Sequence, residues 1–103
     1  MAKGDQKDRL TKLRRQPELI LIWSGHAEKR LSEYGSSYGL SKLDCERIVR
    51  NGALRLPETN VDGEETVHAA GAVDGNALEV VVSVKSTEYG EIVKIVTLKP
   101  KKR

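Results

Sequence analysis

The spacing of hydrophobic positions along the chain changes near Gly52. Before it, apolar residues recur three or four positions apart, as on one face of a helix. After it, they alternate with polar residues, as in half-buried strands. Helices followed by strands favour an α+β fold. The pattern predicts two N-terminal helices packed on a three- to four-stranded antiparallel meander sheet.

Cap and stop signals place these two helices. Ser24 is a candidate N-cap, and its helix is expected to stop at Gly35, with a loop up to residue 39. Ser41 is the second candidate N-cap. The helix after it is expected to leave through Gly52 in the left-handed region.

Two earlier segments carry weaker signals. Residues 5–15 are expected to form a short amphipathic helix, with Leu10 and Leu13 on one side. The apolar run 19–23 is too short for periodicity to classify, so a strand and the buried lead into a helix both stay open. We divide the chain into a basic N-terminal arm over residues 1–18, partly helical or disordered, a single α+β domain over 19–99, and a basic C-terminal tail over 100–103.

Turn signals divide the second half into strands. We expect strands over residues 54–56, 66–73, 78–85 and 91–99. Asp74 and Gly75 predict a two-residue hairpin turn, because both residues tolerate positive φ. A three-residue turn at 88–90 would then place Lys85 beside Val93.

The hairpin register decides which residues share a sheet face. It places Val81 between His68 and Thr97, which are then two strand spacings, roughly 10 Å, apart. If Asn76 joined the turn, the register would slip by one residue and His68 would turn into the core. The apolar face, which the helices are expected to cover, comprises Val67, Ala69, Val73, Leu78, Val80, Val82, Val84, Val96 and Leu98.

Composition narrows the class of protein. The 103 residues suit one small domain, with 38% hydrophobic and 32% charged residues. No apolar run approaches the roughly 20 residues that a membrane helix needs. The single cysteine excludes an intramolecular disulfide. We therefore expect a cytoplasmic or delivered soluble domain with no membrane partner and no cofactor.

Positive charge gathers at the two ends of the chain. Residues 1–16 carry +4 and residues 99–103 another +4, so the 82 residues between them carry −5. Basic ends can hold a phosphate backbone, which needs only point charges at close range, although solubilising tails have the same composition. The candidate nucleic-acid-binding residues are Arg14, Arg15, Lys85, Lys99, Lys101 and Lys102.

Few residues are candidates for chemistry. His26 and Arg30 are four apart, so on a helix they share a face and can approach one phosphate. A solvated surface pair would have the same spacing. His68 has a plain alternative as a strand histidine with one backbone or Thr66 contact. Cys45 is expected to be a half-buried structural thiol, and we expect no metal site, because the two histidines lie on separate elements.

The stretch Gly25 to Leu31, GHAEKRL, resembles the H-A-x-x-R opening of a family of small bacterial domains of unknown function. In that family a second helix and a meander follow, ending in an apolar strand with a Thr. The arrangement is similar to the barnase–EndoU–colicin–RelE-type toxin ribonucleases, small metal-independent domains with an α+β sheet. The resemblance implies attack of an RNA 2′-hydroxyl on its neighbouring phosphate. The candidate catalytic residues are His26 and His68 as base and acid, Arg30 for the phosphate charge, and Thr97 to position an oxygen.

Three functions follow from these observations. The first is a toxin-like, metal-independent endoribonuclease, with RNA as substrate and a cognate antitoxin or immunity protein as partner. The alternative is a non-catalytic module that binds nucleic acid or protein, and the third is an antitoxin or immunity-type protein with an acidic body. A separation below roughly 8–10 Å between the imidazoles of His26 and His68 favours catalysis, because both must reach one phosphate. Opposite sides of the sheet favour the binding module.

Overall fold

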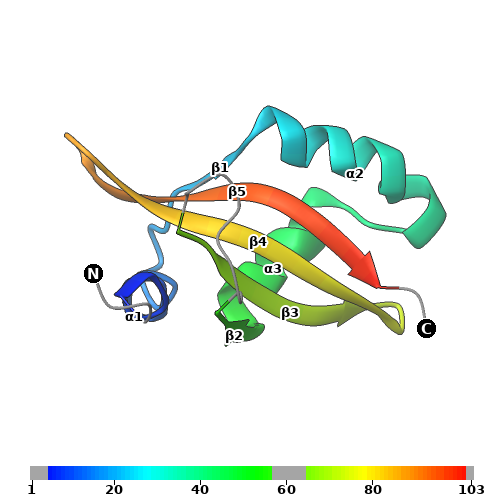
Figure 1. Ribbon diagram of the computed structural model, residues 1–103, viewed down its shortest axis with the longest axis horizontal. Coiled ribbons are helices and arrows are strands. Elements are labelled where there is room, and N and C mark those ends of the chain that lie inside the picture. The colour runs from blue at the N-terminus through cyan, green and yellow to red at the C-terminus, as the bar shows by residue number, and fades with distance from the viewer. Residues whose placement is uncertain (1–4, 57–64, 102–103) are drawn as a thin grey trace.

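The computed structural model describes residues 5–56 and 65–101, which form three helices and five strands (Figure 1). In chain order the elements are α1 (Asp5–Leu13), β1 (Leu21–Trp23), α2 (Gly25–Tyr38), α3 (Lys42–Asn51), β2 (Ala53–Arg55), β3 (Val67–Val73), β4 (Asn76–Thr87) and β5 (Gly90–Lys101). The expected α+β class is confirmed.

The strands form one mixed sheet in the order β1-β5-β4-β3-β2. The pairs from β2 to β5 are antiparallel, but β1 is parallel to β5, with Trp23 opposite Ile95. The predicted antiparallel meander of three or four strands is therefore wrong, because the run 19–23 supplies a parallel strand. Parallel neighbours need a long crossover, and here the chain from α2 to β4 makes it.

The helices and the sheet share one hydrophobic core. α2 packs on β5, and α3 packs on β3 and β4, behind which it lies in Figure 1. We call the sheet face that contributes to this core the inner face, and the opposite face, which carries His68 and Thr97, the outer face. The fully buried Leu10 of α1 joins the same core, so residues 5–13 of the expected N-terminal arm belong to the folded domain, as a third helix.

Gln6 ties α1 to the sheet. Its buried side-chain amide donates to the carbonyl of Val84 (3.2 Å) and accepts from the N–H of the same residue (2.8 Å). The pairing of β3 with β4 begins only at Val67 and Val82, so these groups of Val84 lie beyond its end. The side chain of Gln6 thus satisfies backbone groups that would cost free energy if buried unpaired.

α2 is longer than expected. It passes through Gly35 and ends at Gly39, whose φ of 68° lies in the left-handed region. The added turn brings the rings of Tyr34 and Tyr38 into an edge-on contact, 5.9 Å between centroids, and both pack against the core. This packing offsets the cost of a glycine inside a helix, about 1 kcal/mol. The stop predicted at Gly35 and the loop after it are therefore wrong.

The two serine caps are confirmed. The side chain of Ser24 accepts a hydrogen bond from the N–H of Ala27 (3.0 Å). Ser41 and Asp44 form a reciprocal capping box, in which each side chain accepts from the other residue's backbone N–H. These contacts satisfy N–H groups that a helix start leaves unpaired.

Gly52 ends α3 in a different conformation from the one predicted. Its φ of −72° and ψ of 164° are extended, so the left-handed exit is wrong. Space explains the glycine instead. A Cβ at this position would lie 2.6 Å from the carbonyl oxygens of both Ile48 and Ala70. The end of α3 therefore approaches β3 too closely for a side chain.

The β3–β4 hairpin forms as predicted. Asp74 and Gly75 make its two-residue turn, with φ values of 50° and 81°. This register sets His68 opposite Val81. Val81 in turn pairs with Thr97 on β5, so the predicted row across three strands is confirmed.

Two local departures compensate each other between β4 and β5. The turn has two residues, because Thr87 pairs with Gly90, and Lys85 therefore pairs with Ile92 rather than with Val93. A bulge between Val81 and Val82 then restores the register expected toward Thr97.

The bulge also changes which residues of β5 enter the core. Val93 and Ile95 are fully buried in it, whereas Val96 is only half-buried. The predicted place of Val96 on the apolar face is therefore wrong. The extra residue in β5 shifts the alternation of side chains by one on its N-terminal side, while Leu98 beyond it is buried as predicted.

Candidate functional site

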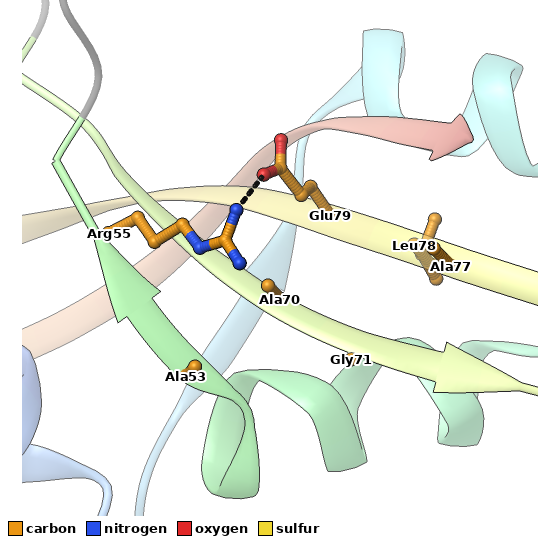
Figure 2. Close-up of a pocket in the computed structure, with 7 residues that line it drawn as sticks. All are labelled: Ala53, Arg55, Ala70, Gly71, Ala77, Leu78 and Glu79. Carbon is orange, nitrogen blue, oxygen red and sulfur yellow. Dashed lines mark ion pairs between the residues drawn. The ribbon is translucent and has the colours of Figure 1, made fainter.

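The outer face is hollowed near the β3–β4 hairpin. The hollow has a volume of about 300 Å³ and is lined by Ala53, Arg55, Ala70, Gly71, Ala77, Leu78 and Glu79 (Figure 2). Its shape follows from the register, in which Ala53 is opposite Ala70 and Ala70 is opposite Glu79. Small side chains on β2 and β3 therefore leave space beside a long acidic one on β4. We call this site the outer hollow.

Three ionisable side chains from three strands form one network, in which Arg55 and Glu79 line the outer hollow and His68 contacts Glu79. Oε2 of Glu79 lies 3.3 Å from Nδ1 of His68, and Oε1 lies 3.8 Å from Nη1 of Arg55. Figure 2 shows the guanidinium of Arg55 reaching across β3, over Ala70, toward Glu79. The side chains of His68 and Glu79 are 14% and 12% exposed, and that of Arg55 is 64% exposed. The network is thus buried at one end and open to solvent at the other.

This network orients two reactive groups. When Nδ1 of His68 carries the proton and donates to Glu79, Nε2 is left as a proton acceptor. The same carboxylate holds the guanidinium of Arg55 above the outer hollow, with its other donors available to an anion. The arrangement combines an oriented imidazole with a solvent-facing cation.

Positive charge exceeds negative charge on the outer face. Among the side chains that the structure describes, strand alternation and pairing place four cations there, namely Arg55 on β2, Lys85 on β4, and Lys94 and Lys99 on β5. Glu79 is the one carboxylate that the described parts of these strands add to this face. Lys99 is exposed and is opposite Glu79. Lys85 makes a further contact, and without it the excess amounts to two positive charges, around the outer hollow and along β5.

The structure separates the two histidines. His26 is exposed in the first turn of α2, a helix that packs on β5. Strands β4 and β5 lie between that helix and His68 on β3. Arg30 is folded along its own helix, where Nη1 donates to Oη of Tyr34 (2.6 Å) and the guanidinium carbon lies 5.6 Å from the ring centroid. The order of the elements therefore forms two groups, one on α2 and one on the outer face with Thr97.

The candidate phosphate-binding residues near the C-terminus follow β5. Lys99 is exposed on the outer face, and Lys85 is half-buried on β4. Lys101 is the last residue of β5 and pairs with Ala77. Lys102 lies outside the described residues.

Arg14 has a structural role. Its Nη1 donates to the carbonyl of Gly52 (2.7 Å) and weakly to that of Val49 (3.5 Å). A cation at this place satisfies carbonyls that the end of α3 leaves free. Arg15, one residue further on, is exposed to solvent.

Sequence reasoning missed two members of the network, Glu79 and Arg55, as site residues. Glu79 carried a usable signal, because it is a single acid within the apolar run of β4 and the hairpin register sets it diagonal to His68. Arg55 carried none, because residues 56–66 separate β2 from β3, and the turn signal of Asp62 and Gly63 within so long a segment does not fix their register.

Cys45 is a structural thiol. It is fully buried on α3, and burial, followed by the charges of Asp44 and Glu46, raises its pKa to about 11. The thiol therefore stays protonated at pH 8, and its reactivity rises only as the pH approaches about 11. We expect iodoacetamide at pH 8 to alkylate the folded protein about 100-fold or more slowly than the urea-unfolded chain, as measured by mass spectrometry. Equal rates would contradict the burial of this side chain.

The described residues contain neither a metal-binding cluster nor a membrane-crossing helix. They hold no group of three or more His, Cys, Asp or Glu side chains placed to ligate a metal ion. None of their helices combines the length and the apolar character needed to span a membrane.

Comparisons of the chain with protein-family models, with curated proteins and with solved structures each gave no match. The resemblance of residues 25–31 to the H-A-x-x-R domains therefore stays an expectation from sequence.

Proposed function

We propose that this protein binds single-stranded RNA on the outer face of its sheet. The observation that carries the proposal is the excess of positive charge there, with Arg55, Lys94 and Lys99 against Glu79. Lysine and arginine side chains bind phosphates and release condensed counterions, which drives such binding. A sheet face suits a strand laid across it, whereas a duplex groove admits a helix or a two-stranded ribbon. The exposed Arg55 and Lys99 flank the outer hollow, where a strand would make its central contacts.

Salt dependence tests this proposal. A labelled RNA of mixed sequence, about 12 nucleotides long, is titrated with the full chain by fluorescence anisotropy between about 50 and 200 mM salt. Three phosphate contacts, from Arg55, Lys94 and Lys99, predict that log K falls with log salt at a slope of about −2, since each contact on a single strand contributes about −0.7. A duplex of equal length is expected to bind more weakly. Absence of binding at low salt, or a slope near zero, would overturn the proposal.

One observation favours a second function, RNA cleavage without a metal. In the tautomer of His68 whose Nδ1 donates to Glu79, Nε2 is the atom that would take the proton of a 2′-hydroxyl. The 2′ oxygen then forms a bond to the adjacent phosphorus, and the bond from phosphorus to the 5′ oxygen breaks, with a proton from water going to that oxygen. Arg55 would offset the negative charge of the phosphate. The resemblance of GHAEKRL to the toxin-related domains implies the same reaction but places one imidazole on α2.

Two matched variants separate these assignments. RNA is incubated with the protein in EDTA, and its products are tested for 2′,3′-cyclic phosphate ends. If His68→Ala abolishes cleavage and His26→Ala does not, the reaction is assigned to the outer hollow. The reverse result would assign it to α2. Binding without any cleavage by the unmodified protein would exclude the nuclease and leave the RNA-binding module.

A further inference from the structure

We infer that the outer hollow receives one guanine base of the bound strand, an inference that rests on the proposed RNA binding. The volume of the hollow, about 300 Å³, lies at the lower end of the range typical of small-molecule sites. A site of this size suits one planar ring system with the backbone left outside. The phosphates on either side of the base would then lie near the exposed cations.

The floor of the outer hollow fits a flat ring. Ala53 and Ala70 are opposite each other on β2 and β3, and on β4 Ala77 lies two residues before Glu79, which is opposite Ala70 (Figure 2). Three neighbouring strands span roughly 10 Å, about the length of a purine with its exocyclic groups. Methyl groups on this floor offer an apolar surface against which a base can lie, and none of them competes for its hydrogen-bonding edge.

Arg55 supplies the recognition. Its guanidinium extends over Ala70 and is aimed by the ion pair with Glu79, 3.8 Å between Nη1 and Oε1 (Figure 2). A guanidinium donates two parallel hydrogen bonds, and guanine presents two neighbouring acceptors, O6 and N7, on one edge. Adenine presents an amino donor beside N7, so the same fork meets one acceptor and one donor. Cytosine presents a donor and uracil a single carbonyl on the corresponding edge.

Four RNA oligonucleotides test the inference. They consist of uridines with a single G, A, C or U at the centre, and each is titrated with the full chain by fluorescence anisotropy. The G oligonucleotide is expected to bind about 5- to 150-fold more tightly than the others, as for other bidentate contacts of arginine with guanine. Arg55→Lys keeps the charge but removes the fork, so it should abolish the preference for G and retain affinity for the all-uridine strand.

A second pair of variants tests the hollow itself. Ala77→Leu would fill it and is expected to remove the preference for G. Ser32→Leu adds the same side chain at an exposed position of α2, away from the hollow, and should leave the preference unchanged. If circular dichroism shows that Ala77→Leu unfolds the protein, the base preference of Arg55→Lys still tests the inference. Equal, salt-sensitive binding of all four strands, or a preference for another base, would overturn the inference. Binding of none of them would overturn the proposed function itself.

Discussion

Replacing both Arg55 and Lys99 by alanine is expected to weaken RNA binding about 30-fold near physiological salt. Each lost phosphate contact removes on the order of 1 kcal/mol, and about 1.4 kcal/mol corresponds to a tenfold change. The slope of log K against log salt should fall in magnitude by about 1.4, because each single-strand contact contributes about 0.7. Both side chains are exposed, so the fold should persist. Anisotropy titrations at several salt concentrations measure both quantities.

A second double variant controls for total charge. Lys29→Ala with Arg47→Ala removes the same two charges from exposed positions on α2 and α3. These side chains belong to the helices and not to the outer face, so the affinity should fall less than about threefold. Equal losses in the two double variants would show that net charge alone drives binding, and the outer face would lose its assignment.

Sequence predicted those parts of the fold that neighbouring residues decide. The caps at Ser24 and Ser41 depend on contacts three residues away, and the turn at Asp74 and Gly75 depends on its own two φ values. Near each of these positions, no other cap or turn signal of similar strength competes with it. Gly35 shows the limit of such local signals. It is a helix stop signal in the sequence, but the packing of the tyrosine rings on the core favours a helix that continues through it.

Long-range pairing was beyond sequence reasoning. Trp23 lies opposite Ile95, and no turn signal connects residues so far apart in the chain. The sequence therefore leaves the run 19–23 open between a strand and the lead into a helix, and the chain adopts the strand, at the edge of the sheet and parallel to β5. The bulge at Val81 and Val82 was equally invisible, since a three-residue turn without it gives the same pairing of Val81 with Thr97.

The candidate site likewise has some contacts that the sequence predicts and others that it does not. The row from His68 through Val81 to Thr97 was predictable, because a short turn sets it. The contact of Arg55 with Glu79 joins β2 to β4 across β3, and so depends on strand order as well as on register. The separation of His26 from His68 likewise required the position of α2 against β5.

Gly52→Ala is expected to destabilise the protein by about 3 kcal/mol, the upper part of the range for overpacked sites. Backbone strain is not the reason, because φ of −72° with ψ of 164° suits any residue. The new Cβ would lie 2.6 Å from two carbonyl oxygens, those of Ile48 and Ala70. Neither oxygen can yield easily, since Ile48 accepts a 2.7 Å hydrogen bond from the N–H of Gly52 and Ala70 belongs to the paired strand β3. Urea unfolding followed by circular dichroism measures the change.

Gly25→Ala is the matched control for this prediction. No heavy atom of another part of the chain lies within 4 Å of a Cβ built at Gly25, the first residue of α2. Alanine there should stabilise the protein by about 0.5–1 kcal/mol, because it lowers the entropy of the unfolded chain and favours the helix. The same chemical change thus has opposite signs at the two glycines. Equal free energies of unfolding for the two variants would contradict the close approach of α3 to β3, which also sets where β2 begins and from where Arg55 reaches the outer hollow.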